Sequence, residues 1–103
     1  MPTNAQLTPR LKALVHWLRR HFPARTPVIV RVGNVPGAHG ICEIGGDRAL
    51  IRLTAGHEQM MKETLLEEWA HVLRHDTPVP CDDDHDAIFW AILGAVTKKW
   101  RDE

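Results

Sequence analysis

Three residues in one short segment have the side chains and the spacing of a metal site. Residues 64–73 have the sequence TLLEEWAHVL, which contains Glu67, Glu68 and His71. On a helix, side chains four positions apart share a face, so Glu67 and His71 can bind one ion. Glu68 lies alongside, where a carboxylate can serve as a base toward water at that ion. The spacing is that of HExxH with glutamate in place of the first histidine, and it predicts a site for zinc or another divalent transition metal.

His85 is the expected third ligand. Catalytic zinc sites typically have three protein ligands and one open position. His85 follows the Glu67/His71 helix after one short loop, and it begins the apolar stripe of the next helix, so we expect it to point inward. The predicted ligand set is therefore two histidines and one glutamate, with Glu68 as the base. A polar cluster with a structural role is the alternative.

Two neighbouring residues are candidates for a supporting or competing role. His71 and His75 are also four positions apart, so they form a second possible metal pair, with Glu67 or Glu68 as the third ligand. His75 can instead be a hydrogen-bond partner behind the ligands, and Asp86 is a second candidate for that role.

Other polar residues nearby have simpler explanations. Cys81 lies in a loop restricted by prolines, so it is not expected to bind the metal. The aspartates of residues 82–86 are suited to cap the free N–H groups at a helix start. The segment that begins at His57 resembles HExxH but has Met61 at the place of the second histidine, so it predicts an ordinary helix entry.

Three helices are expected to position these side chains. The first begins at Thr8-Pro9, a capping hydroxyl followed by proline, and ends at Pro23. The second covers about residues 57–75 and carries the candidate ligands on one polar face. The third covers about residues 84–100 and is apolar over most of its circumference, so we expect it to be buried on more than one side, with Trp90 in the core.

Three short strands are expected between the first two helices. They cover residues 28–32, 40–44 and 48–53, and Gly45-Gly46-Asp47 predicts a hairpin connection. Gly40, inside the second strand, indicates a bulge or, alternatively, a close backbone approach. The predicted fold class is α+β: an N-terminal helix, a small three-stranded antiparallel sheet, an active-site helix and a buried C-terminal helix.

The composition sets limits on the class of protein. The 103 residues suffice for one domain, and the 13 basic and 13 acidic side chains cancel, so the net charge indicates neither nucleic acid nor a membrane as partner. Cys42 and Cys81 form no paired-cysteine pattern, which argues against a disulfide framework. No stretch has the roughly 20 apolar residues of a membrane span, and no signal peptide is evident. We therefore expect one cytoplasmic domain over residues 1–103.

The segments LLEEWAHVL and HDAIFW, together with the order of the elements, resemble the SprT-like and minimal zincin metallopeptidases. In that family an HExxH helix is followed by a short loop and a third ligand at the start of the next helix. The resemblance implies that Glu67 replaces the first ligand histidine, that His71 and His85 match the other two, and that Glu68 is the general base. The chain departs from the family pattern at Glu67, at Asp86, where glycine is common, and in lacking the zinc ribbon that targets some relatives to DNA.

Two functions follow from this resemblance. One is zinc-dependent hydrolysis of a peptide or protein substrate that lies along the edge of the sheet by β-augmentation. The alternative is a catalytically inactive module of zincin fold that binds metal or another protein. A nucleic-acid-binding module would rest only on the basic outer face of the first helix, which solvent exposure explains equally well. The sequence does not predict an oligomeric state.

Overall fold

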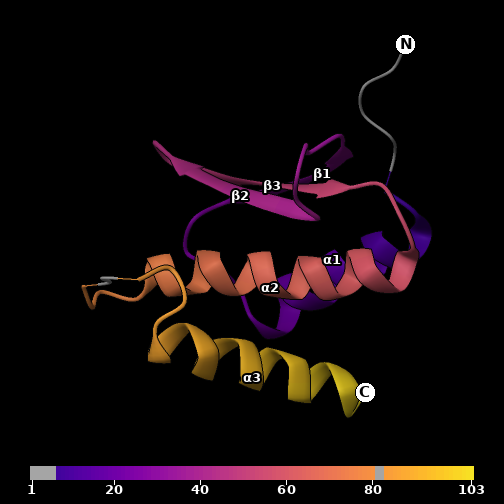
Figure 1. Cartoon of the computed structure of the whole chain (residues 1–103). Helices are drawn as coiled ribbons and strands as arrows, with labels where there is room; N and C mark the ends of the chain where they lie inside the picture. Colours follow the sequence, from indigo (N-terminus) through magenta and orange to yellow (C-terminus); the bar gives the residue numbers. More distant parts are fainter. Residues whose placement is uncertain (1–6, 81–82) are drawn as a thin grey trace.

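The computed structural model describes residues 7–80 and 83–103, so the expectations for Cys81 and Asp82 lie outside the described residues. A three-stranded sheet, a middle layer of two helices and a third helix below them form three layers (Figure 1). The element order is α1 (Pro9–His21), β1 (Val28–Gly33), β2 (Gly40–Gly45), β3 (Arg48–Thr54), α2 (Glu58–Asp76) and α3 (Ala87–Arg101). The α+β class and this order of elements agree with the sequence prediction.

Helix α1 begins where the sequence predicts it. The Thr8 hydroxyl accepts a hydrogen bond from the Leu11 amide at 3.2 Å, and Pro9 occupies the first turn, where its missing N–H needs no partner. The helix buries one apolar stripe against the rest of the domain: Leu11, Leu14, Val15 and Leu18. This stripe places α1 beside α2 in the middle layer (Figure 1).

The sheet is mixed, which corrects the expectation that all strands are antiparallel. Its strand order is β1-β3-β2, with β1 parallel and β2 antiparallel to β3. The β2–β3 hairpin forms as predicted, and Gly46 has a φ of +60° in its turn. Strand β3 has the most apolar inner face, with Ala49, Ile51 and Leu53 fully buried, so it takes the central place and pairs on both edges. Strands that follow each other in the sequence therefore do not all pair, and in the described part of the chain one edge of β2 has no partner strand.

Gly40 marks a close approach of β2 to α2. The pairing of β2 with β3 is continuous from Gly40 to Gly45, so the bulge expected at Gly40 is wrong. A Cβ at this position would lie 2.6 Å from Thr64 Cγ2 and 3.1 Å from the Arg52 carbonyl oxygen. Only glycine allows the strand to lie this close to the helix that carries the candidate ligands.

Helix α2 is the centre of the domain. It contacts β2 and β3 on one side and α1 and α3 on the others. Trp69 is almost completely buried, and its indole Nε1 donates a hydrogen bond to the Phe22 carbonyl at 2.9 Å. Because the sheet and both other helices hold it, α2 is a rigid support for the side chains on its polar face. No helix among the described residues combines the length and the apolar character needed to cross a bilayer.

Helix α3 is packed on one side rather than sandwiched, which corrects the expectation of a buried C-terminal helix. It lies along α2 as the outermost layer (Figure 1), and only Phe89 and Val96 are fully buried. Trp90, expected in the core, is exposed. The apolar residues around the rest of the helix are mostly small or half-buried. An apolar composition over most of the circumference therefore did not mean that the helix is buried on more than one side. The helix begins at Ala87 after the Asp86 cap, so His85 lies in the turn before it.

Candidate metal centre

Glu67, His71 and His85 meet at one point, as the sequence predicts. Their ligand atoms all lie within 4.8 Å of one another, and the Nε2 atoms of the two histidines are 3.2 Å apart. Two nitrogen ligands of a tetrahedral zinc ion, each about 2.0–2.1 Å from it, lie roughly 3.3 Å apart. The two imidazoles therefore have the separation that a shared ion requires, and a carboxylate oxygen of Glu67 belongs to the same close group.

The Phe89 ring packs against both imidazole rings. This buried ring stacks on His71 with centroids 4.4 Å apart and contacts His85 at 4.8 Å. The exposed ring of Trp90 also lies near His85, with ring centroids 5.6 Å apart. His85 is exposed, which corrects the expectation that it points into the core. One side of the ligand group is thus fixed by aromatic packing, while the other side is open to solvent.

The surroundings of His71 favour its neutral form. Burial lowers the pKa of His71, and the neighbouring His85 lowers it further, although Glu67 and Asp84 act in the opposite direction. Neutral imidazole is the form of histidine that binds a metal ion. His71 is therefore kept as a ligand at pH values where an exposed histidine begins to take up a proton.

Glu68 is a buried carboxylate next to the ligand group. Only 7% of its surface is exposed, and burial together with the charge of Glu67 raises its pKa to about 7, against a smaller opposing effect of His85. A carboxyl group with this pKa exchanges protons at neutral pH. Glu68 is therefore a buried, titratable carboxyl group beside the candidate ligands.

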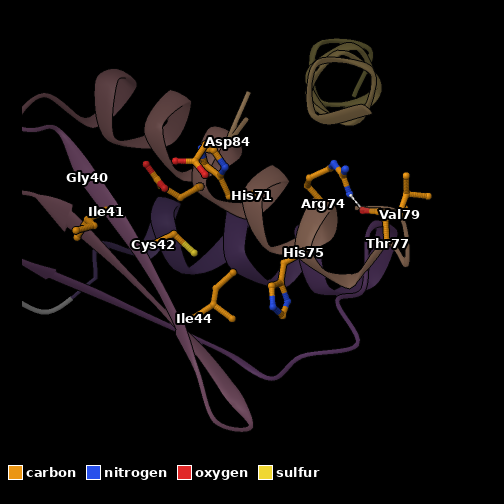
Figure 2. Close-up of a pocket in the computed structure, with 11 residues that line it drawn as sticks. Gly40, Ile41, Cys42, Ile44, His71, Arg74, His75, Thr77, Val79 and Asp84 are labelled. Carbon is orange, nitrogen blue, oxygen red and sulfur yellow. Dashed lines mark hydrogen bonds between the residues drawn. The ribbon is translucent and has the colours of Figure 1, made fainter. Parts of the chain in front are cut away.

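A cleft of about 500 Å³ lies between the second half of α2 and the outer strand β2. Cys42 and Ile44 of β2 face His71 and His75 of α2 across it (Figure 2). Burial, followed by the charges of Glu68 and Glu43, raises the pKa of the Cys42 thiol to about 12. Since the thiolate is the reactive form, Cys42 is inert as a nucleophile at neutral pH. The remaining walls come from β2, the end of α2 and the following loop: Gly40, Ile41, Glu68, Arg74, Thr77, Val79 and Asp84.

His75 borders the cleft one turn beyond His71. Its side chain is 57% exposed, and its Nδ1 lies 3.9 Å from Asp76 Oδ1. Within the described ranges, Glu67, His71 and His85 are the one group of three donors close enough to hold an ion. The geometry therefore brings His71 together with His85 rather than with His75.

Arg74 is the residue of this region that the sequence did not reveal. It is only 4% exposed, although arginine is among the residues least often buried. Its guanidinium binds both carboxylate oxygens of Asp86, the cap of α3. The aspartate-rich loop suggested capping, which Asp86 confirms. No sequence pattern indicated that an arginine one turn after His71 would bind this aspartate.

Comparison of the chain with known protein families, curated proteins and solved structures gave no match. The resemblance to zincins therefore rests on the motif and on the order of the elements. The chain is a small α+β domain with a Glu/His/His group that could hold a metal ion.

Proposed function

We propose that this protein is a zinc-dependent peptidase of minimal zincin type, in which Glu67, His71 and His85 hold the ion and Glu68 is the general base. The observation that carries the proposal is the convergence of three ligand atoms within 4.8 Å of one another beside a buried carboxyl group with a pKa of about 7. A structural polar cluster does not require this combination of ligand spacing and raised pKa.

The residues present suit a catalytic rather than a structural ion. Two histidines and one glutamate are a common catalytic ligand set, and three protein ligands leave one position open. Bound there, zinc supplies Lewis acidity that polarises a carbonyl oxygen and makes water more acidic. The exposure of His85 leaves this open side accessible to a substrate.

Glu68 handles the proton in the proposed reaction. Its carboxylate takes a proton from the attacking water as the new C–O bond forms at the scissile carbonyl carbon. It then gives this proton to the amine nitrogen as the C–N bond breaks, so the proton count balances. In the metal-free protein the pKa of Glu68 is raised to about 7, so this carboxyl group can exchange protons near neutral pH.

Strand β2 is the proposed binding place for the substrate backbone. One edge of β2 has no partner strand among the described residues, and its residues form one wall of the cleft. An extended peptide can add to such an edge through main-chain hydrogen bonds. The exposed side chains of Ile41 and Val79 border the same cleft, which favours a substrate with apolar side chains on either side of the cleaved bond.

One observation favours a second candidate, a metal-binding module without hydrolytic activity. Glu67 stands where the zincin pattern has histidine, and a carboxylate neutralises more of the charge of the ion than imidazole does. The ion is then a weaker Lewis acid and activates water less. Under this alternative the cleft binds a protein segment without cutting it.

A proteolysis assay with three proteins separates the two candidates. Zinc-loaded wild type, Glu68→Gln and Glu67→His are incubated with unfolded protein substrates, and cleavage is followed by mass spectrometry. Wild type should cut, and Glu68→Gln should keep zinc but lose at least about 100-fold in rate, as expected for a general base. If Glu67→His cuts the substrate and wild type does not, the natural protein is the non-catalytic module. If neither wild type nor Glu67→His cuts it, the peptidase proposal is contradicted.

A further inference from the structure

We propose that Arg74 is a positioning residue that holds the third ligand, His85, over His71. This inference rests on the proposed metal site but concerns how that site is built. Arg74 and His71 lie one turn apart on the rigid helix α2, whereas His85 lies in an exposed turn outside any helix. Something other than helix geometry must therefore fix the distance between the two histidines.

The Arg74 guanidinium binds the loop that leads to His85 at several points. Its Nε donates to Asp86 Oδ1 at 2.9 Å and to Oδ2 at 3.0 Å, and its Nη2 donates to Oδ2 at 2.6 Å. Its two terminal nitrogens also donate to the carbonyl oxygens of Val79 and Pro80, both at 3.1 Å. Figure 2 shows Arg74 extended toward the loop at Val79. The buried Arg74 side chain thus binds both the start of the loop, at Val79 and Pro80, and its end, at Asp86.

Asp86 transmits this contact to the ligand. It directly follows His85 in the sequence, and its Oδ1 accepts a hydrogen bond from the Phe89 amide at 2.9 Å, which caps α3. The same carboxylate therefore fixes the backbone beside His85 and the start of the helix that carries Phe89. The Phe89 ring packs against both ligand imidazoles. The Arg74–Asp86 ion pair therefore positions His85 in two ways, through the adjacent backbone and through Phe89.

The consequence is a site that is formed before the ion arrives. Without the Arg74–Asp86 pair, metal binding would also have to order the turn that carries His85, and this ordering would reduce the affinity. Residues behind the ligands of metal sites typically contribute about 10- to 100-fold to metal affinity. Lysine cannot replace arginine here, because its single ammonium lacks the planar fork that reaches a carboxylate and two carbonyls together.

The test is titration of folded, metal-free protein with Zn²⁺, and with Co²⁺ to follow the ligand geometry by its visible absorption. Arg74→Lys should weaken zinc binding by about 10- to 100-fold and reduce the tetrahedral Co²⁺ bands. In a protein that already carries His85→Ala, Glu67 and His71 alone should bind zinc only weakly, below stoichiometric uptake, and Arg74→Lys should not lower this weak affinity further, because the ligand that it positions is gone. A loss of stability alone would not produce this dependence on His85.

A matched control and a second variant guard against effects of misfolding. Asp76 also accepts three hydrogen bonds near the end of α2 but joins it to Arg25 and Thr26, away from the His85 turn, so Asp76→Asn should leave zinc affinity unchanged. If Arg74→Lys does not fold, Arg74→Met combined with Asp86→Ser removes both charges and keeps a helix cap. This double variant should show the same 10- to 100-fold weakening.

The outcomes separate this inference from the proposed function. Wild-type zinc affinity in the folded Arg74 variants, or an equal further loss in the His85→Ala background, would overturn the positioning role while leaving the metal site intact. Failure of the wild-type protein to bind zinc would overturn both.

Discussion

The Nε2 atoms of His71 and His85 lie 3.2 Å apart, although 14 positions separate the two residues in the sequence. Both rings turn the same nitrogen toward a common point, and the Glu67 carboxylate approaches that point from the preceding turn of α2. Without an ion, the same distance allows one N–H···N hydrogen bond between the two rings. The relationship is the one expected of ligands to a shared cation.

Glu68→Gln should stabilise the metal-free protein at pH 8. The carboxyl pKa is raised from 4.5 to about 7 on folding, so between these values the folded state binds a proton that the unfolded state has lost. The free energy of unfolding of the wild type therefore falls as pH rises through this window. Glutamine stays neutral at all of these pH values, so the variant does not lose this stability. We expect a gain of about 1–2 kcal/mol in the free energy of unfolding at pH 8 and almost none at pH 4, allowing for solvent screening. Urea denaturation with a chelator present measures both values, and an equal effect at the two pH values would contradict the raised pKa.

Asp76→Asn should destabilise the fold at neutral pH but not in strong acid. Although burial opposes it, hydrogen bonds from the Thr26 hydroxyl and from the amides of Arg25 and Thr26 lower the pKa of Asp76 below 3.8. Its stabilisation is thus present above that value and is lost as pH falls through the lowered pKa. We expect a cost of about 1 kcal/mol at pH 7 that disappears in strong acid. Urea midpoints of wild type and variant across pH 2–7 should converge at the acid end, and parallel curves would be inconsistent with this role.

Gly40→Ala should show how closely β2 must approach α2. The added methyl would lie 2.6 Å from Thr64 Cγ2 and 3.1 Å from the Arg52 carbonyl oxygen, so strand and helix must separate. We expect a loss of about 1–3 kcal/mol, typical of an overpacked site. Thr64→Ser removes the closer of the two contacts and should restore part of this loss when combined with Gly40→Ala. Additive effects of the two substitutions would show that the contact with Thr64 is not the cause.

The parts of the fold that follow from local rules could be predicted from the sequence. The Thr8-Pro9 start of α1, the β2–β3 hairpin and the span of α2 each depend on nearby residues, and the structure has all three. The spacing of Glu67 and His71 on α2 is likewise fixed by the helix itself. The approach of His85 could be anticipated because a short loop limits how far it can lie from the helix before it.

The remaining features depend on contacts between segments distant in sequence. The parallel pairing of β1 with β3 is decided by which strand is buried most deeply, and the exposure of Trp90 by the absence of a layer over that side of α3 among the described residues. The role of Arg74 could not be predicted, because a basic residue in the last turn of a helix is usually exposed and interacts with the negative end of the helix dipole. Its burial follows from the path of the loop between α2 and α3, which no local pattern encodes.

The central claim, that Glu67, His71 and His85 hold one metal ion, is tested most directly by isothermal titration of the chelator-treated protein with Zn²⁺. We expect one ion per chain for wild type, loss of stoichiometric binding in His71→Ala and His85→Ala, and nearly unchanged binding in the control His75→Ala. A wild-type protein that takes up no zinc, or a His85→Ala variant that binds zinc as tightly as wild type, would contradict a shared ion at these three residues.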